Sequence, residues 1–262
     1  MTLERGPGAA PPPGEAEAPE GAVAAPAPPF VPPAPWTPER LRAGAARLLP
    51  EPPPLARARL RGDHDLNPGW APSEGSPGSG APGGRGRAVS PLADPATAKA
   101  AAVLVPIVAR PRATLLLTLR AAHLSAHAGQ VAFPGGRVEA SDAGPAEAAL
   151  REAWEEIGLE PGRAEPLGFL DPYLTGTGYR IVPLVALVEP GFTLALDPAE
   201  VADAFEIPLD HALDPARHER RSLLWRGAER HFFAIAGTEP EVWGATAGII
   251  RSLYERLDEG GA

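Results

Sequence analysis

The sequence contains no cysteine, one methionine and a single lysine, Lys99. Without cysteine the chain has no disulfide, no thiolate nucleophile and no cysteine-based zinc or iron–sulfur site. This composition fits a reducing compartment, and we expect a cytoplasmic protein. The remaining cationic side chains are almost all arginines, and proline and glycine are abundant at 35 and 29 residues. We interpret this bias as a property of the coding sequence and not as a functional signal.

Long apolar segments are also missing. The longest run, residues 100–109, contains Pro106 and is far shorter than the roughly 20 residues of a membrane span. The N-terminus has no basic region followed by an apolar stretch, so we expect neither a secretory signal nor a membrane partner. The net charge of −9 does not favour a nucleic-acid partner. A small anionic ligand stays compatible with this charge if metal ions neutralise the contact.

Composition divides the chain into four parts. Residues 1–36 are rich in proline and alanine and cannot bury enough apolar surface to fold, so we expect a disordered tail. A proline-rich ligand for a partner domain is the alternative there. Residues 37–71 form a short helical segment, residues 72–97 a flexible linker and residues 98–258 the main domain.

The helical segment begins with Thr37, Pro38 and Glu39, which have the chemistry of an N-cap, a first helical residue and a first-turn acid. We expect this helix to end near Leu49, before Pro50. Arginines cluster in the segment. They either form a nucleic-acid patch or are solvated side chains on a peripheral helix.

The main domain mixes strands and helices without a regular βαβ repeat, so we expect an α+β fold or a three-layer α/β/α sandwich with a mixed sheet. Residues 121–130 form a loop. The periodicity predicts strands at residues 101–108, 114–120, 166–170 and 179–188, a hairpin from residues 223–225 and 231–235, and helices at residues 145–157 and 243–257.

The most informative stretch runs from residue 135 to residue 159. Its three glutamates, Glu152, Glu155 and Glu156, have helical i, i+3, i+4 spacing and therefore share one face. Clustered carboxylates repel one another unless a cation lies between them, and Mg²⁺ or Mn²⁺ prefers such oxygen ligands. A solvated acidic helix face is the alternative. The glycine pair upstream, which lets the backbone turn tightly, favours the metal site.

The adjoining stripe of this helix is apolar. Ala149, Leu150, Ala153 and Ile157 recur at helical spacing, so we expect them to pack on the sheet. The helix would then be anchored by one face and would present its carboxylates with the other.

This stretch resembles the Nudix box, the glycine- and glutamate-rich signature of the Nudix hydrolases. The run from Arg151 to Leu159 fits without a gap. The first half departs, because Asp142 stands at the acidic position and the spacing from there to Arg151 is one residue longer. One branch of the family has this longer box with aspartate, so the departure narrows the resemblance to that branch.

That branch is the coenzyme A pyrophosphatase-like group. Upstream segments are similar to it as well: LLTLR ending at Arg120, HAGQ from His127 to Gln130, and FPGG ending at Gly136. The resemblance covers about residues 98–258 and implies the sandwich fold. It further implies metal-dependent hydrolysis of the pyrophosphate of coenzyme A or acyl-CoA, which gives 4′-phosphopantetheine and adenosine 3′,5′-bisphosphate.

The resemblance also implies roles for the box residues. Glu155 and Glu156 would bind the metal directly, and Glu152 would bind a metal or orient water. Arg151 would position the glutamates by pairing with one of them. A backbone carbonyl of Gly135 or Gly136, with Gly136 taken as the ligand, would complete the set.

Residues outside the box are less determined. Glu200 is the candidate general base, with Glu206 second, and the alternative for Glu200 is an acid at a helix start. Arg120 either contacts a substrate phosphate or forms a structural ion pair. His127 and Gln130 contact substrate or order their loop. Asp142 is expected to brace its loop, and Phe133 and Trp154 are expected in the core.

Other functions stay open at this stage. The substrate could instead be NADH, ADP-ribose, a dinucleoside polyphosphate or a damaged nucleoside triphosphate, because each contains a nucleoside diphosphate. A sensor that binds nucleotide without cleaving it is a third hypothesis, which the intact glutamates disfavour. The sequence leaves open whether the chain forms a homodimer.

Overall fold

The computed structural model describes residues 34–54, 60–67, 97–225 and 228–258. Residues 35–262 belong to one compact unit. The expectations for the proline-rich tail and for most of the linker lie outside the described residues. Among the helices described, none combines the length and the apolar character that a bilayer crossing needs.

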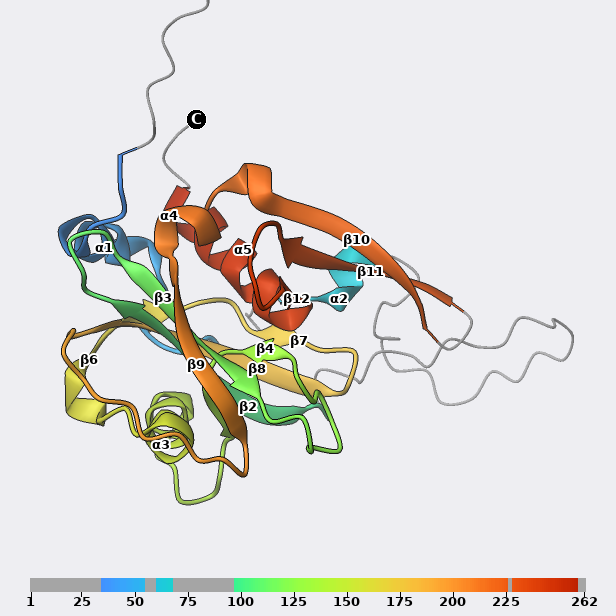
Figure 1. The fold of residues 1–262 in the computed structure, drawn as a ribbon, viewed down its shortest axis with the longest axis horizontal. Coiled ribbons are helices and arrows are strands. Elements are labelled where there is room, and N and C mark those ends of the chain that lie inside the picture. Colours follow the sequence, from blue (N-terminus) through green and yellow to red (C-terminus); the bar gives the residue numbers. More distant parts are fainter. Residues whose placement is uncertain (1–33, 55–59, 68–96, 226–227, 259–262) are drawn as a thin grey trace, which may run out of the picture. The chain divides into compact units, whose positions relative to one another are not determined.

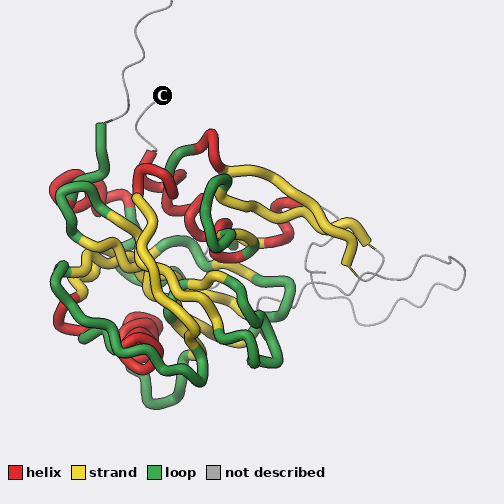
Figure 2. Tube along the Cα trace, viewed as in Figure 1, coloured by secondary structure: helices red, strands yellow, loops and turns green. Residues whose placement is uncertain are grey.

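A nine-stranded mixed sheet forms the centre of the unit (Figures 1 and 2). Its long middle strands, β2 and β8, are parallel, and β1 with β7 is the other parallel pair. The order is β1-β7-β8-β2-β3-β4, with β5 on β2, β6 on β8 and β9 on β3. The strands are β1 (Arg61–Gly62), β2 (Lys99–Val108), β3 (Thr114–Arg120), β4 (Val131–Ala132), β5 (Gly135–Arg137), β6 (Ala164–Phe169), β7 (Tyr173–Leu174), β8 (Tyr179–Val188) and β9 (Val201–Pro208).

Helices cover both faces of this sheet. Helix α3 (Pro145–Ile157) lies on one face and α5 (Ala245–Asp258) on the other (Figure 1). Each face has its own apolar core: Ile157 of α3 packs with Leu104 of β2, whereas Leu253 of α5 belongs to the cluster that contains Ile107. Alternate residues of β2 thus point to opposite faces, as the twofold repeat of a strand requires. The α/β/α sandwich expected from the sequence is confirmed.

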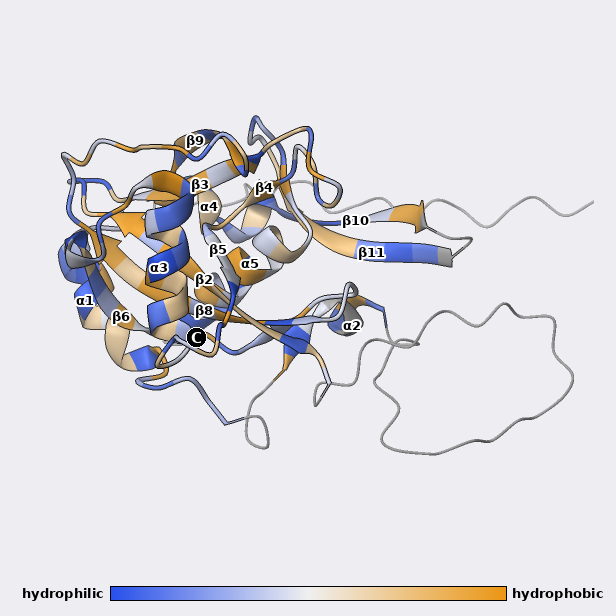
Figure 3. Cartoon of the chain, turned by 90° about the horizontal axis from the view of Figure 1, so that it is seen from below, coloured by the Kyte–Doolittle hydropathy of each residue, from blue (hydrophilic) through white to orange (hydrophobic). Residues whose placement is uncertain are grey.

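Local sequence explains the bounds of α3. Pro145 stands at its first position, where the missing N–H costs nothing. Gly158 ends it in the left-handed conformation, φ 68°, and donates its N–H to Trp154 O. Ala149, Ala153 and Ile157 are buried, so the predicted apolar stripe faces the sheet. Hydropathy colouring separates the hydrophilic and apolar residues of α3 (Figure 3).

The C-terminal part adds a second, three-stranded sheet. It consists of β10 (His218–Trp225), β11 (Ala228–Ile235) and β12 (Val242–Trp243). The predicted hairpin is present, with strands longer than expected. Short helices complete the unit: α2 (Asp63–Leu66), α4 (Leu209–Ala212) and the 3-10 turns η1 (Ala45–Arg47), η3 (Pro161–Arg163) and η4 (Pro215–Arg217).

The described part of the N-terminal segment belongs to the same compact unit. Helix α1 (Pro38–Gly44) starts at Thr37, whose hydroxyl accepts from Arg40 N. Leu41 and Leu48 are buried in the α5-side core, and Leu49 pairs with Phe169. The sequence suggested a separate segment because its own apolar residues are few. Its packing surface is supplied by α5 and β6, which lie far away in the chain.

Several boundaries differ from the sequence prediction. Helix α1 ends at Gly44, where a 3-10 turn replaces the expected last helical turn. Trp36, assigned to the tail, packs against the core, and its N–H donates to Asp210 Oδ1. Strand β9 was not predicted. Its residues do not alternate cleanly, because charged side chains such as Glu206 lie on its partly exposed face.

Replacing Leu41 with alanine should lower the free energy of unfolding by about 2–5 kcal/mol, because a fully buried leucine leaves a cavity. Denaturant unfolding measures this. The matched control is Arg42→Ala, next in sequence, which removes only an exposed pair with Glu165 and should change stability by less than about 1 kcal/mol. Equal effects of the two variants would contradict the packing of α1 on the domain.

Candidate functional site

The glycine pair forms the start of β5, an edge strand paired with β2. Bonds from Leu104 N to Pro134 O and from Val138 N to Ala100 O set the alternation of this antiparallel ladder. With that alternation, Gly136 directs its N–H and C=O toward β2, whereas the polar groups of Gly135 point outward. Consistently, Gly135 N donates to Glu156 Oε2 at 3.1 Å.

Glu156 is the buried carboxylate of the site. Only 5 % of its side chain is exposed. One oxygen accepts the Gly135 N–H, and the other lies 3.9 Å from the Nη1 of Arg120, at the end of β3. From helical spacing we expected all three glutamates on the face of the helix that does not pack on the sheet. This is wrong for Glu156, which the α3 helix places against the sheet, while Glu155 is 55 % exposed.

Glu152 lies directly against Gly136. A Cβ atom on that glycine would come within 2.4 Å of the Glu152 carboxylate, so only glycine permits this contact. A Cβ on Gly135 would come within 2.4 Å of the Ala102 carbonyl, and Gly135 has φ 154°. Glycine is therefore required at the two positions for different reasons. Gly135 is required by the backbone of β2, and Gly136 by the carboxylate.

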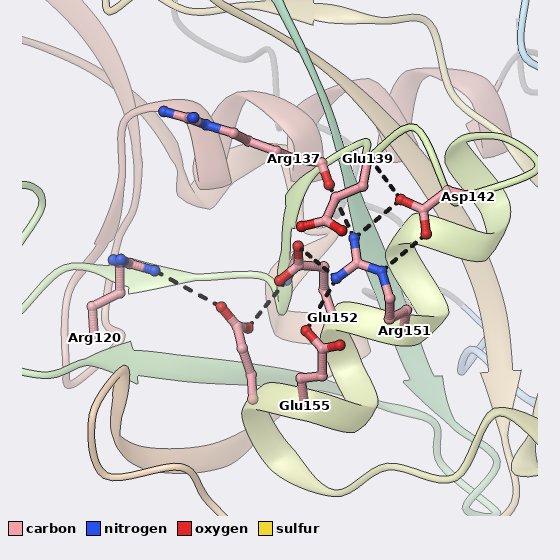
Figure 4. Close-up of polar contacts among 9 residues, drawn as sticks. Arg120, Arg137, Glu139, Asp142, Arg151, Glu152 and Glu155 are labelled. Atoms are coloured by element: carbon pink, nitrogen blue, oxygen red, sulfur yellow. Dashed lines mark hydrogen bonds and ion pairs between the residues drawn. The ribbon is translucent and has the colours of Figure 1, made fainter.

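Arg151 joins the loop to the glutamates (Figure 4). Its Nε and Nη2 donate to the two oxygens of Asp142 at 2.9 and 3.1 Å. Its Nη1 donates to Glu152 at 3.1 Å and to Glu155 at 3.0 Å, and Nη2 also donates to Arg137 O. Asp142, expected to brace the loop, accepts in addition from Glu139 N at 2.7 Å. One guanidinium thus holds the loop and two carboxylates in place.

The pKa values of the carboxylates in this cluster are shifted in opposite directions. Burial raises the pKa of Glu156 to about 7, with a further contribution from the charge of Glu200. Burial also raises the pKa of Glu152, although Arg151 opposes the shift. Asp142 shows the reverse: its hydrogen bonds from Arg151 hold its pKa below the usual value. The carboxylates nearest the glycine pair are therefore harder to ionise than exposed ones, chiefly because they are buried.

This arrangement fits a divalent metal ion. Within the described ranges, no three carboxylate or imidazole groups converge closely enough to form a complete metal site. The donors nevertheless are hard oxygen ligands, and a cation beside them would offset the cost of ionising the buried carboxylates of Glu152 and Glu156. Glu152, Glu155 and Glu156 are the side chains that would hold the ion.

Glu200 lies in the turn before β9, with its N–H bonded to Asp197 O and its carbonyl to Ala121 N. The predicted alternative, an acid at a helix start, is wrong because a strand follows. Its charge acts on both Glu152 and Glu156, so the fold brings it to the box. Glu206, at the other end of β9, is bound by Arg110 at 2.7 Å and by the Thr114 hydroxyl. That engagement makes it structural.

The loop of residues 121–130 is closed by backbone bonds between Arg120 and Gln130 and between Gly129 and Arg120. His127, at φ 57°, places its Nδ1 2.8 Å from Gln130 Oε1. The two side chains order the loop in this way. Their contact with substrate remains a prediction.

The two aromatic expectations have different outcomes. Phe133 is buried in the core, as predicted. Trp154 is 50 % exposed, so its assignment to the core is wrong. Its position on α3 lies outside the buried stripe that the alanines and Ile157 form, which the helical spacing alone could have indicated.

Comparisons with known proteins identify the family. A model of the NUDIX domain matches residues 98–226. A protein of Shigella flexneri named Nudix hydrolase NudL, and described as uncharacterized, is 44 % identical over 160 residues, which are 61 % of this chain and 83 % of that protein. The chain belongs to the Nudix hydrolase family. The NudL protein of Escherichia coli K12 is similar too, at 45 % identity over 153 residues, 58 % of this chain and 80 % of the relative.

Membership of this family gives the reaction class. Nudix pyrophosphohydrolases act on nucleoside diphosphate derivatives and generally use divalent metal ions. Among solved structures, an Ap4A hydrolase complex of C. elegans resembles 43 % of this Nudix chain and 83 % of its own, at 19 % identity and a TM-score of 0.38. That likeness is too low to carry an argument.

Stability of the Nudix domain should depend on pH through Glu156. In chelator, its carboxyl has a pKa of about 7 when folded and about 4.5 when unfolded, so ionisation favours the unfolded chain. The loss of folding stability that ionisation of Glu156 causes is absent below pH 4.5, grows as the pH rises, and is complete above pH 7. Glu156→Gln should therefore stabilise the metal-free protein by roughly 2–3 kcal/mol at pH 8, and by little at pH 4.5.

Unfolding in denaturant across this pH range measures the difference. The control is Glu155→Gln, whose half-exposed carboxylate lies on the same helix face. A stabilisation by Glu156→Gln that does not vary with pH would contradict the buried-carboxylate assignment.

The two glycines should respond differently to alanine. In Gly135→Ala the new methyl meets the backbone of β2, which cannot move, so stability should fall by about 1–3 kcal/mol. In Gly136→Ala it meets only the end of the Glu152 side chain. Stability should change by less than about 1 kcal/mol, and pyrophosphohydrolase activity should fall at least tenfold because Glu152 is displaced. Thermal unfolding and turnover, measured on both variants, test the contrast.

Proposed function

We propose that this Nudix hydrolase cleaves the pyrophosphate of coenzyme A or an acyl-CoA in a reaction that requires Mg²⁺ or Mn²⁺. The products are 4′-phosphopantetheine, or its acyl form, and adenosine 3′,5′-bisphosphate. The observation that carries the proposal is the bidentate Asp142–Arg151 pair. It supports the interpretation that the longer box is a functional variant of the signature, in which Asp142 takes the acidic position and binds Arg151.

The second support comes from outside the box. Arg120, the last residue of the LLTLR segment, places a guanidinium 3.9 Å from Glu156, and its Nε is buried without a partner among the described residues. A cation held beside the carboxylates can bind an anionic phosphate oxygen. Within this proposal, Arg120 binds the diphosphate and releases its weak contact with Glu156 when substrate is present.

The carboxylates have distinct tasks in the proposal. Glu155 and Glu156 bind the metal, and Glu152 binds it or orients the attacking water. The outward-facing carbonyl of Gly135 is a better backbone ligand than that of Gly136, which the ladder directs toward β2. When bound, the ion neutralises the diphosphate oxygens and lowers the pKa of the nucleophilic water.

The remaining residues position these groups and move the proton. Arg151 keeps Glu152 and Glu155 in place through its two Nη1 bonds. Glu200 is exposed and close enough to influence both inner glutamates, so we assign it as the general base that takes the proton from water. His127 and Gln130 hold the loop that Arg120 begins.

The test is a panel of pyrophosphate substrates assayed with Mg²⁺, with Mn²⁺ and with chelator. Coenzyme A should be hydrolysed faster than NADH, ADP-ribose and dinucleoside polyphosphates, and chelator should abolish turnover. Glu156→Gln should lower the rate at least a hundredfold while the fold survives, because it removes a ligand and a buried like charge.

The matched control is Glu160→Gln, an exposed acid beyond the end of α3 that pairs with Arg163. It should retain full turnover. Rapid hydrolysis of another nucleotide with none of coenzyme A would reject the substrate and keep the class. Near-normal turnover by Glu156→Gln would reject the ligand assignment.

A further inference from the structure

Three side chains form a basic cluster where β2, β5 and β8 meet. Lys99 lies opposite Tyr179 in the parallel pair, and Arg137 lies opposite Ala101, two residues along β2. Arg137 Nη2 donates to the Tyr179 hydroxyl at 3.1 Å. The tyrosine ring has Lys99 Nζ 5.6 Å and the Arg137 guanidinium carbon 5.9 Å from its centroid.

The charges of this cluster are not compensated. In the described part of the chain, neither Lys99 nor Arg137 forms an ion pair with a carboxylate, although most arginines of this acidic protein do. Both cations are exposed. The hydrogen bond from Arg137, together with the charges of Arg137 and Lys99, lowers the pKa of the Tyr179 hydroxyl, so the local field is positive. Two unpaired cations around a phenol favour an anion.

The cluster adjoins the diphosphate site. Arg137 follows Gly136 directly, and its carbonyl accepts from Arg151. Side chains alternate along β5, so Arg137 projects from the face opposite to the one on which Glu152 meets Gly136. Among the described strands, β5 pairs with β2 only, which leaves its outer edge open between the two faces. In Figure 4 the Arg137 side chain points away from Arg151, toward the side on which Arg120 lies.

We propose that Lys99, Arg137 and Tyr179 form a subsite for a phosphate monoester of the nucleotide substrate, separate from the diphosphate that the glutamates and Arg120 engage. The inference rests on the proposed function. In coenzyme A the phosphate monoester that the subsite would bind is the 3′-phosphate, which the ribose separates from the diphosphate. A phosphate dianion neutralises both cations, and its oxygens accept from Arg137, Lys99 and the phenol.

The single lysine permits a direct test that needs no turnover. Acetylation by an N-hydroxysuccinimide ester modifies only Lys99 and the N-terminal amine in this chain. Cleavage at arginines then isolates Lys99 in the peptide of residues 88–112 for mass spectrometry, because the bond between Arg110 and Pro111 resists cleavage. Saturating adenosine 3′,5′-bisphosphate should slow acetylation of Lys99 at least tenfold, while AMP at saturation should slow it less than twofold. The N-terminal amine serves as the internal control.

Calorimetry establishes saturation by both nucleotides in the same buffer with Mn²⁺. Equal protection by the two nucleotides overturns the subsite, because Lys99 would then respond to the nucleoside or to the 5′-phosphate. Bound adenosine 3′,5′-bisphosphate without protection overturns it as well, and so does failure of this ligand to bind.

Kinetics on coenzyme A and 3′-dephospho-coenzyme A give the second measurement. Lys99→Gln and Arg137→Gln should each lower kcat/KM for coenzyme A at least tenfold more than for the dephospho form, mainly through KM. Both side chains are exposed, so the variants should fold. Arg112→Gln, which removes an exposed arginine paired with Asp210, is the matched control and should leave the ratio of the two substrates unchanged.

The two hypotheses fail in different ways. Wild-type protein that hydrolyses neither form of coenzyme A rejects the proposed function, and the acetylation experiment then decides the subsite alone. Wild-type protein that hydrolyses both, with a substrate ratio unaffected by Lys99→Gln and Arg137→Gln, rejects the subsite and leaves the proposed function standing.

Discussion

The site depends on one buried carboxylate. Glu156 accepts the N–H of Gly135, and this hydrogen bond joins α3 to the edge strand β5. The cost of burying the charge appears in its raised pKa of about 7. An isolated buried carboxylate gives a fold little stability, because desolvation offsets what its hydrogen bond contributes. A bound cation would offset the cost of burying this carboxylate, which is the role that we propose for the metal ion in the Nudix box.

The carboxylates around Glu156 are unequally paired with arginines. Asp142, Glu152 and Glu155 share one guanidinium, that of Arg151, while Glu156 has only the distant contact with Arg120. Arg151 thereby holds Asp142, Glu152 and Glu155 in place, whereas the charge of Glu156 has a weaker counterion. A metal ion that enters next to Glu156 would not need to displace the pair of Asp142 and Arg151.

The proposed substrate side shows the complementary distribution of charge. Arg120 stands at the end of β3, and Arg137 and Lys99 stand on β5 and β2, so cations flank the carboxylates on a chain whose net charge is −9. A nucleotide anion would then be attracted locally although the protein as a whole repels it. The strands of one sheet carry these cations, so the pairing of the strands sets the spacing of their backbone positions.

The sequence by itself determined α3, its apolar stripe and the grouping of Glu152, Glu155 and Glu156, because helical spacing and end signals are local properties. It also determined the long strands β2, β3 and β8, whose apolar residues are contiguous. Tertiary structure alone decided how deeply Glu156 is buried, that Glu200 before β9 comes close to the box, and that α1 packs on α5. Those features depend on contacts between residues far apart in the chain, and no pattern within a short window of sequence encodes such contacts.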